Sequence, residues 1–598
     1  MAKTLIQKSI HGSTIPHVEL FRVPMTQKMI PTQAILSLAL FMLLAILPTN
    51  EIRADETRPN VILIMGDDMG YTDIGCYGGE IATPALDKLA ANGIRFTQFY
   101  NCARCCPTRA SLLTGLYSHQ AGIGLMTENL GYDAYQGDLN ESCVTIAEVL
   151  GAAGYRNYLS GKWHVTKHTQ PSGPNHNWPL QRGFDDFYGT IIGAGSFYDP
   201  ATLCRGNQFI TPDNDTDYQP ETFHYTQAIS DHAVEFLKQH ETDHSDQPFF
   251  LYVSYTAAHW PMHALEKDIA KYRGKYAEGY QAIRQARYER AAQLGVIDPQ
   301  WKLSPPAWDW QETDNLDWEQ ACMEVYAAMI DQMDQGIASI VSQLEEQDKL
   351  ENTIIIYLQD NGGCAEWFGR ASNADDKDKF DYKPFAADDL QTKIWPPMQT
   401  RAGNWVRTGP EVTPGPADTF IAYGIGWANT SNTPFRGYKH DNYEGGISTP
   451  FIVHWPAGIQ SAQRNSIVDS PCHLIDVMPT LSELCRAPYP ANFQGKAIQP
   501  MAGVSLQPTL IGRPLKRTQP IAFEHHGNLA LRDGRWKIVS QYKKDHPTTW
   551  ELYDMQADRT EQNDLADTMP EKVKELSSRW QSWADRVGVQ PWPVQKKD

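Results

Sequence analysis

The chain has 598 residues, of which 41% are hydrophobic and 21% are charged, a composition typical of globular proteins and not of disordered or fibrous ones. Its formal net charge of -19 argues against nonspecific binding to nucleic acid or to anionic membranes, since both need a basic surface. Any anionic ligand would have to meet a local cluster of Lys, Arg or bound metal.

The first part of the chain carries an apolar run at residues 34–47. The run is shorter than the ~20 residues of a membrane-spanning helix, which favours a signal peptide over residues 1–54, with a small-residue cleavage point at Ala54. An uncleaved membrane anchor is the alternative, and translation from Met25 or Met29 would give a more ordinary signal peptide. We expect an exported protein, periplasmic or secreted, without stable insertion into a membrane.

Strands and helices alternate along the next several hundred residues. Apolar runs at residues 60–68, 249–255 and 353–359 predict strands that are buried on both faces. Residues 83–93 carry an N-cap, a proline in the first turn and a closing glycine, and a second helix is predicted around residues 318–344. This alternation predicts an α/β fold with helices on both faces of a large sheet, in which sites gather beyond the carboxyl ends of strands.

The pattern changes towards the end of the chain. Apolar and polar residues alternate around a hairpin signal at residues 533–534, and Pro570 begins an amphipathic helical pattern. We therefore expect a large α/β domain over residues 55–515 and a small domain of antiparallel sheet and helix over residues 516–598. Residues 371–429 are rich in Asp, Pro and Gly and predict a long irregular insertion that lines a pocket.

The most informative segment reads CCPTRASLLTG and begins at Cys105. Pro107 suits the first turn of a helix, so Cys105 is expected at a helix N-terminus, where free N–H groups favour an anion. Arg109 follows one turn later. An ordinary buried thiol is the alternative for the cysteine alone. The whole segment matches the signature C-x-P-[S/T]-R, and the chain resembles the type I sulfatases of the alkaline phosphatase superfamily, with residues 120–142 most similar to the arylsulfatase branch.

The resemblance implies an alkaline-phosphatase-like fold and a modified active-site residue. In that family the first cysteine of the signature is oxidised to formylglycine by a separate maturation enzyme, and the hydrated aldehyde is the nucleophile. Since the modified position lies two residues before the proline, Cys105 is implicated and Cys106 is not.

Two pairs of oxygen ligands follow buried strands. Asp67 and Asp68 come after the first predicted strand, and Asp360 and Asn361 follow the strand at residues 353–359. Solvated turns are the ordinary interpretation of either pair alone, but two such pairs favour a metal site for calcium, with magnesium less favoured. The resemblance implies the following ligands: Asp67, Asp68, Cys105, Asp360 and Asn361.

Zinc is disfavoured by the cysteine pattern. The chain has ten cysteines, and the local group Cys102, Cys105 and Cys106 is not followed by a second paired set of Cys or His ligands. The cysteines are also too sparse for a disulfide-rich scaffold, and their spacing assigns no pairing.

Three further elements resemble the family's catalytic segments. Lys162 and His164 lie in a G-K-W-H element, His259 follows the strand at residues 249–255, and Lys439 lies in a late lysine segment. Taken singly, such residues are more often hydrogen-bonded surface groups. The resemblance implies that Arg109, Lys162 and Lys439 balance charge with the cation. It also implies that His259, with Lys439, protonates the leaving oxygen, and that His164 takes the proton whose loss expels sulfate.

The function implied by the resemblance is hydrolysis of a sulfate monoester to an alcohol or phenol and inorganic sulfate. The partner would be a small-molecule or saccharide sulfate ester, and the identity of its alcohol depends on loops that sequence patterns do not place. Two alternatives stay open. One is a phosphoester or phosphonate hydrolase of the same superfamily, and the other is a non-catalytic binding homologue that is never oxidised at Cys105.

Overall fold

The computed structural model describes residues 58–597 of the chain. The predicted signal peptide lies outside these residues. Within them, no helix is both long and apolar enough to cross a membrane. All ten cysteines fall in the described range, and none of them forms a disulfide there.

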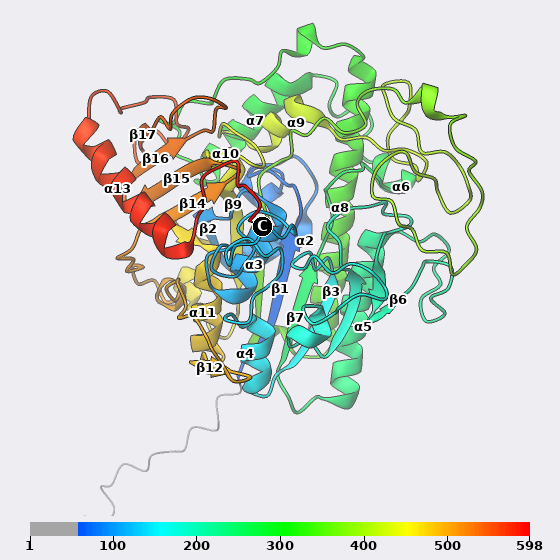
Figure 1. The fold of residues 1–598 in the computed structure, drawn as a ribbon, viewed down its shortest axis with the longest axis horizontal. Helices are drawn as coiled ribbons and strands as arrows, with labels where there is room; N and C mark the ends of the chain where they lie inside the picture. The colour runs from blue at the N-terminus through cyan, green and yellow to red at the C-terminus, as the bar shows by residue number, and fades with distance from the viewer. Residues whose placement is uncertain (1–57, 598) are drawn as a thin grey trace, which may run out of the picture. The chain divides into compact units, whose positions relative to one another are not determined.

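An eleven-stranded mixed sheet forms the centre of the structure (Figure 1). Its middle strands β8, β1, β7, β3 and β4 run parallel, whereas β9 is antiparallel to both of its neighbours. Across the sheet, the order is β10 (Ser466–Val468), β2 (Ile94–Tyr100), β9 (Ser448–His454), β8 (Thr353–Gln359), β1 (Asn60–Gly66), β7 (Phe249–Ser254), β3 (Arg156–Gly161), β4 (Asp186–Thr190), β5 (Leu203–Arg205) and β6 (Gln208–Phe209), with β11 (Cys472–His473) paired to β2.

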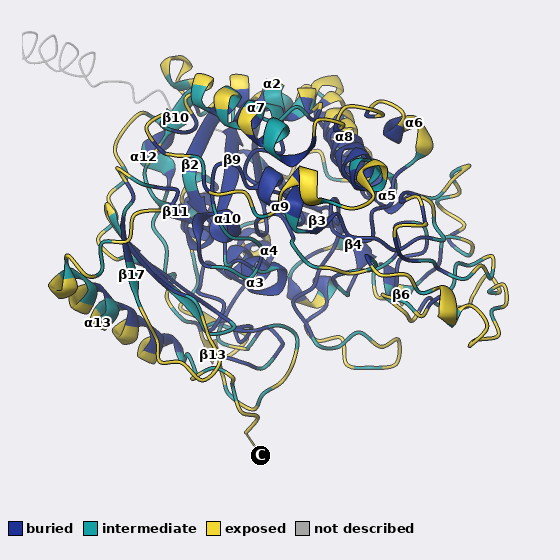
Figure 2. Ribbon diagram, turned by 90° about the horizontal axis from the view of Figure 1, so that it is seen from above, coloured by how far each residue is buried: buried dark blue, intermediate teal, exposed yellow. Residues whose placement is uncertain are grey.

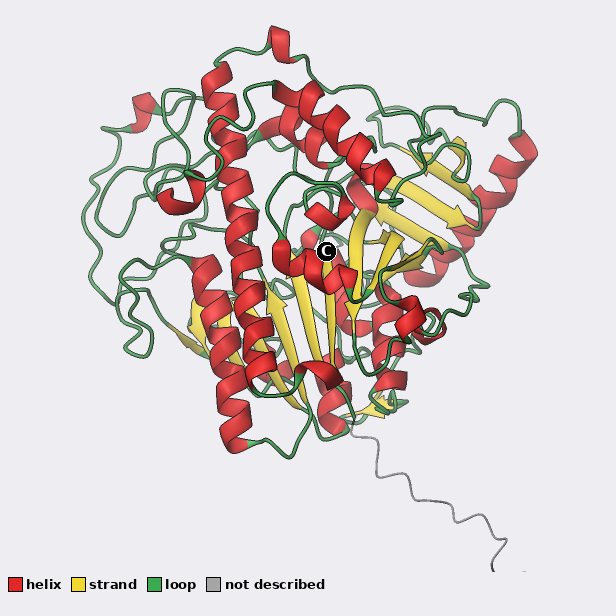
Figure 3. Cartoon of the chain, turned by 180° about the vertical axis from the view of Figure 1, so that it is seen from behind, coloured by secondary structure: helices red, strands yellow, loops and turns green. Residues whose placement is uncertain are grey.

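Two hydrophobic cores lie on opposite faces of this sheet. Successive side chains of a strand point to opposite faces, and in β1 Ile62 and Ile64 join one core while Val61 and Leu63 join the other. The prediction of helices on both faces is therefore confirmed, as Figure 3 shows. Helices that supply the first core are α2 (Pro84–Ala91), α5 (Tyr225–Asp243), α6 (Glu266–Ile269), α7 (Gly279–Gln293), α8 (Leu316–Glu346) and α9 (Gly424–Ser431); those of the second are α3 (Cys105–Thr114), α4 (Ile146–Ala152), α11 (Val477–Leu484) and α12 (Gln507–Leu510).

The C-terminal part forms a small antiparallel sheet covered by one helix. Its strands, in order, are β14 (Ile521–His525), β15 (Asn528–Asp533), β16 (Trp536–Ser540) and β17 (Glu551–Asp554), and the helix is α13 (Pro570–Val587). Helix α13 buries Leu576, Trp580 and Trp583 against the sheet and exposes its opposite side (Figure 2). The predicted hairpin and terminal helix are confirmed. A separate short hairpin pairs β12 (Asn492–Phe493) with β13 (Lys496–Ala497).

Buried ion pairs join the small sheet to the rest of the structure. Glu444, the first residue of α10 (Glu444–Ile447), accepts from Lys537 of β16 at 2.8 Å through one carboxylate oxygen and from Arg559 at 2.8 Å through the other. Glu561 lies 2.7 Å from the same Lys537 Nζ and accepts from the backbone N–H of Glu444 at 2.8 Å. We call these four residues the junction cluster. All four side chains are fully buried.

The predicted insertion is irregular for most of its length. Between residues 371 and 423 the only helical segment is a single 3-10 turn, Ala374–Asp376, and the remainder contains turns and isolated bridges; α9 then begins at Gly424. Residues 413–416 line a pocket of about 260 Å³ together with Tyr198. The insertion borders this pocket, which includes none of the predicted site residues. A part of the insertion in a substrate pocket stays a prediction.

Candidate active site

The two pairs of oxygen ligands meet at one edge of the sheet. Strands β1 and β8 are parallel neighbours with Gly66 opposite Gln359, so the residues that follow each strand leave the sheet side by side. The backbone N–H of Asp68 donates to Asp360 Oδ1 at 3.2 Å. Asp67, Asp68, Asp360 and Asn361 are each at most 1% exposed. The predicted pairs thus form one buried cluster, which we call the strand-end cluster.

Helix α3 brings Cys105 to this cluster. Arg104 is its N-cap in an extended conformation, and Cys105 is the first helical residue, with its side chain buried. Thr108 ties the first turn to β8 by donating from Oγ1 to the carbonyl of Asp360 at 2.6 Å. The expected position of Cys105 at a helix N-terminus is therefore present, and free N–H groups there favour a bound anion.

Two cations are held against the carboxylates. Arg109 donates from Nη2 to Asp360 Oδ2 at 3.0 Å, and the same nitrogen lies 3.4 Å from Asp67 Oδ2. Lys162, directly after β3, donates to Asp67 Oδ2 at 2.5 Å. Arg109 also donates to Ser254 Oγ at the end of β7. Buried charges of opposite sign compensate each other here, which lowers the cost of burying any one of them.

His164 faces the two cysteines at the start of α3. Its Nε2 lies 3.1 Å from Cys106 Sγ. One ring nitrogen of His164 and the sulfurs of Cys105 and Cys106 all lie within 4.8 Å of one another. Burial lowers the pKa of His164 to about 4, although the nearby Cys105 acts in the opposite direction. A Cβ at Gly193 would come within 2.0 Å of the imidazole, so only glycine leaves room for the ring. His164 is therefore neutral at pH 7 and able to accept a proton.

His259 and Lys439 form the opposite side of the cluster. Lys439 Nζ donates to Asp68 Oδ2 at 2.8 Å and lies 3.4 Å from His259 Nε2. His259 Nδ1 is 2.7 Å from the carbonyl of Trp260, which fixes Nδ1 as the donor and leaves Nε2 as the acceptor. Burial lowers the pKa of His259 to about 3. Burial alone would also lower the pKa of Lys439, but Asp68 together with Cys364 and Glu366 raises it well above its usual value. At neutral pH the proton of this pair resides on Lys439.

The strand-end cluster leaves oxygen atoms unused. Among residues 58–597, Asp67 Oδ1 and Asn361 Oδ1 are buried and have no hydrogen-bond partner. Burial and the neighbouring carboxylates raise the pKa of Asp67 well above its usual value, so its charge is poorly compensated. Burial likewise raises the pKa of Asp360. One unpaired carboxylate oxygen and one unpaired amide oxygen among crowded carboxylates fit a hard divalent cation such as calcium or magnesium.

The sequence did not predict a second layer of polar residues around Lys439. Glu366 Oε2 lies 3.5 Å from Lys439 Nζ and accepts from Trp260 Nε1 at 2.7 Å. Its other oxygen lies 3.1 Å from Arg104 Nη1 and 3.2 Å from His440 Nε2. Burial alone would raise the pKa of Glu366, but Lys439, His440 and Arg104 hold it far below its usual value. The only sequence signal was a glutamate shortly after the second ligand pair.

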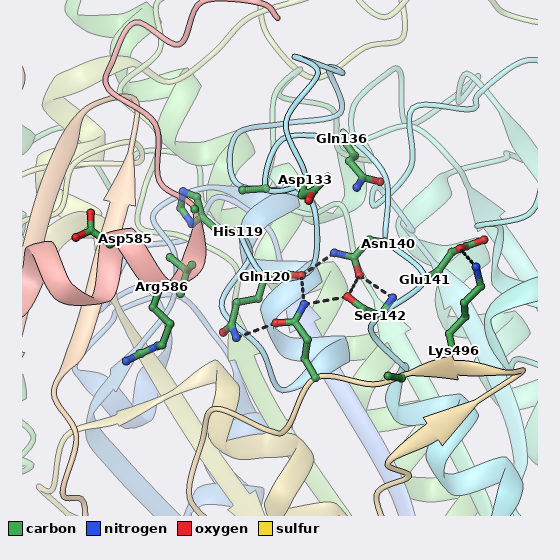
Figure 4. Close-up of a pocket in the computed structure, with 15 residues that line it drawn as sticks. His119, Gln120, Asp133, Gln136, Asn140, Glu141, Ser142, Lys496, Asp585 and Arg586 are labelled. Carbon is green, nitrogen blue, oxygen red and sulfur yellow. Dashed lines mark hydrogen bonds and ion pairs between the residues drawn. The ribbon is translucent and has the colours of Figure 1, made fainter.

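A larger pocket lies apart from these residues. It has a volume of about 650 Å³ and includes none of the predicted site residues (Figure 4). Its polar side chains bond mostly to one another: Gln120 donates to Gln499, and Gln499 donates to Ser142. This mutual pairing gives no indication of a missing ligand.

Comparison with known sequences identifies relatives over most of the chain. The model of the sulfatase family matches residues 59–487, and a model described as N-sulphoglucosamine sulphohydrolase, C-terminal, matches residues 438–583. An uncharacterised sulfatase of Schizosaccharomyces pombe is 30% identical over 90% of this chain and 95% of its own length. An arylsulfatase of Klebsiella aerogenes is 31% identical over 76% of this chain and 92% of its own.

Solved structures share the fold at lower identity. A protein solved in complex with its substrate D-glucosamine-2-N,6-O-disulfate superimposes with a TM-score of 0.57 at 20% identity, covering 90% of this chain and 100% of its own. The PsFucS1 sulfatase from Pseudoalteromonas gives a TM-score of 0.55 at 19% identity, covering 90% of this chain and 92% of its own. These structures confirm the predicted mixed sheet with helices on both faces.

Proposed function

Since the chain belongs to the sulfatase family and is a sulfuric ester hydrolase, we propose that it acts through a formylglycine made from Cys105 and through one bound divalent cation, calcium rather than magnesium. The observation that carries this proposal is that the first turn of α3, which carries Cys105, is bonded to Asp360 of a buried carboxylate cluster that has unused oxygens. The proposal also includes export to the periplasm or beyond, and a separate enzyme that oxidises the thiol.

The cation would be held by the strand-end cluster and residue 105. Asp67 Oδ1 and Asn361 Oδ1 are free to bind it, and Asp68 and Asp360 supply the remaining carboxylate oxygens. When bound, the cation supplies charge stabilisation for a sulfate oxygen. Arg109 and Lys162 keep the carboxylates oriented, because each is hydrogen-bonded to at least one of them. The donor set contains carboxylate and amide oxygens, which suits calcium.

Residue 105 carries the nucleophile in this proposal. A hydrated formylglycine offers two hydroxyl groups, one to attack sulfur and one whose later deprotonation expels sulfate. The N-terminus of α3 stabilises the sulfate oxygens with its free N–H groups. His164 is neutral at pH 7 and lies beside residue 105, which supports its role as the base for the second hydroxyl.

The departing oxygen needs a proton when the alcohol is a poor leaving group. Lys439 carries a proton at neutral pH, and His259 Nε2 lies 3.4 Å from Lys439 Nζ. We assign the general acid to this pair, with His259 meeting the leaving oxygen. Asp68 accepts from Lys439 and keeps the pair charged. This arrangement serves aliphatic and sugar alcohols, whose oxyanions leave poorly without help.

The substrate class is a small-molecule or saccharide sulfate ester. Support comes from the neighbour solved with a sulfated glucosamine and from the arylsulfatase relative. The experiment that tests this compares rates on matched sulfate and phosphate esters of the same sugar and the same phenol. We expect sulfate to be preferred; a preference for phosphate would instead assign the chain to phosphoester hydrolysis.

The modification and the metal are tested on protein made in a host that forms formylglycine. The peptide that contains Cys105 and Cys106 should show an aldehyde at 105 and a thiol at 106 that can still be alkylated. Chelation should remove activity, calcium should restore it and zinc should not. An aldehyde at 106, or full activity in metal-free protein, would contradict the proposal.

A further inference from the structure

A group of metal-binding side chains lies outside the proposed catalytic residues. His168 Nε2 is 3.3 Å from Asp138 Oδ2, and His176 Nε2 is 3.2 Å from the same oxygen. The two imidazole rings lie with their centroids 4.9 Å apart. One ligand atom from each of the three residues lies within 4.8 Å of the others. None of these residues belongs to the strand-end cluster.

The spacing of these atoms suits a tetrahedral ion. Zinc binds imidazole nitrogen and carboxylate oxygen at about 2.0–2.1 Å, so two ligands of one tetrahedral ion lie about 3.3 Å apart. The observed distances from Nε2 to Oδ2 are 3.3 and 3.2 Å. Two imidazoles and one carboxylate favour zinc and related transition metals over calcium, which prefers oxygen ligands alone.

A buried oxygen at this group lacks a partner. Asp138 is only 4% exposed, yet its Oδ1 accepts no hydrogen bond within residues 58–597. The pocket of Figure 4 is different, since Gln120, Ser142 and Gln499 in that pocket are paired with one another. An unpartnered buried carboxylate oxygen costs free energy unless a ligand satisfies it.

The three ligands are carried by well-anchored segments. The carbonyl of His168 accepts from Trp178 Nε1 at 2.7 Å, and Asn177, next to His176, donates to the carbonyl of Leu139 at 2.8 Å. The group lines a pocket of about 560 Å³, and the His176 side chain is 60% exposed. Solvent therefore has access to a fourth coordination position, while backbone contacts hold the ligands in place.

We propose that Asp138, His168 and His176 bind one divalent transition-metal ion, zinc in the first instance, at a second metal site of this protein. Binding joins the segment that follows His164 to the segment that carries Asp138. Because the ion binds the folded chain, in which the three ligands converge, it stabilises the folded state. The proposal stands whether or not the catalytic proposal holds, because the two sites share no residue.

Cobalt is the probe for this site, because tetrahedral Co²⁺ absorbs visible light and thiolate ligands add a near-ultraviolet charge-transfer band. The full chain, with calcium present to occupy the strand-end cluster, should bind one equivalent of Co²⁺ with visible bands and without the thiolate band. Zinc should displace it and raise the thermal midpoint. His176→Ala should weaken Co²⁺ binding at least about tenfold and remove the zinc-dependent rise.

His546→Ala is the matched control, since His546 is exposed on a loop of the C-terminal sheet; its Co²⁺ spectrum should equal that of the wild type. Asp138→Asn is a second variant that should lose Co²⁺ binding as His176→Ala does. Circular dichroism checks that each variant is folded. Visible bands that persist in His176→Ala would place the ion at another group, such as His440, His525 and His526, and a thiolate band would place it at the cysteines. Either result would overturn the proposal. If the protein binds no Co²⁺, Asp138, His168 and His176 form only an ion-pair network, and the proposal is overturned as well.

Discussion

The strand-end cluster and the junction cluster are both buried groups of opposite charges, but they are completed differently. In the junction cluster, both carboxylate oxygens of Glu444 have a cationic partner, Lys537 or Arg559, at 2.8 Å. In the strand-end cluster, Arg109 and Lys162 both bind Asp67 Oδ2, which leaves Asp67 Oδ1 without a partner among the described residues. Glu444 is thus paired through both oxygens, whereas Asp67 keeps one oxygen open towards a ligand.

The difference shows how similar residues come to serve stability in one place and chemistry in another. Burial alone would raise the pKa of Glu444, but Lys537 and Arg559 hold it below its usual value. Burial raises the pKa of Asp67 in spite of its two cations. Burial also raises the pKa of Glu561 in the junction cluster, but its Oε1 lies 2.7 Å from Lys537 Nζ. A raised pKa therefore indicates a cation site only together with an oxygen such as Asp67 Oδ1, which no cation of the described residues contacts. Four predictions test this contrast, from the largest expected effect to the smallest.

The largest effect is expected from Cys105→Ala, which removes the proposed nucleophile beside the strand-end cluster. Turnover should fall by about 10⁶-fold, the scale seen when a covalent nucleophile is deleted, with little change in the unfolding free energy. Steady-state kinetics and chemical denaturation measure both quantities. Cys106→Ala is the control and should retain the aldehyde at 105; equal losses in both variants would argue against a special role of residue 105.

His259→Ala should have a graded effect that depends on the leaving group. General acid catalysis contributes about 10²–10⁴ in rate, so the loss should approach that range for a sugar sulfate. It should nearly vanish for a nitrophenyl sulfate, whose oxyanion leaves without help. His164→Ala should differ, releasing one alcohol per active site in a burst and then stalling as sulfated enzyme. A uniform loss across the leaving-group series would show that His259 only packs against the strand end.

Lys537→Met opens the junction cluster and leaves Glu444 and Glu561 without their shared cation. Breaking a buried ion pair by removing one partner typically costs about 3–5 kcal/mol, and urea denaturation should show a loss of that size. Molecules that remain folded should keep their turnover. Lys543→Met, on an exposed loop of the same sheet, should change the unfolding free energy by less than about 0.5 kcal/mol. An unchanged unfolding free energy in Lys537→Met would mean that the junction cluster adds no stability.

The smallest effect concerns pH. Burial raises the pKa of Glu561 from 4.5 to about 7, so the folded protein holds this proton more tightly than the unfolded chain. The stability that this proton contributes is complete below about pH 4.5 and is lost as pH rises through about 7, a change of about 3 kcal/mol at most. Glu561→Gln should flatten the decline of unfolding free energy over this interval. An unchanged slope would assign the decline to other groups.

Much of the site could be predicted because its residues follow regular elements. Apolar runs of strand length located β1 and β8, and parallel neighbours necessarily bring Asp67 and Asp360 to one edge. Helix α3 was predictable from Pro107 and the motif around it. Each of these signals lies within a short segment of sequence, and the pairing of the strands then places the segments side by side.

Other parts could not be predicted because irregular segments bring them together. Glu366 and His440 meet Arg104 through loops whose paths no periodicity encodes. Asp138 and His176 are 38 residues apart and converge only because a loop folds back. The contact of Cys106 with His164 is also a tertiary detail. Neither the signal peptide nor the domain boundary near residue 515 is tested by the fold, and both remain predictions.

The burial of Cys105 sets an order of events. In the folded protein this side chain is only 2% exposed, under a cluster that draws on residues as far along the chain as Lys439. Another enzyme cannot reach a thiol that is buried in this way. The oxidation that we propose therefore has to take place while the segment is still an extended, accessible peptide. Folding ends the period in which Cys105 can be oxidised. A molecule that folds before the oxidation keeps the thiol at residue 105 and stays inactive. Slower folding should therefore increase the fraction of active enzyme.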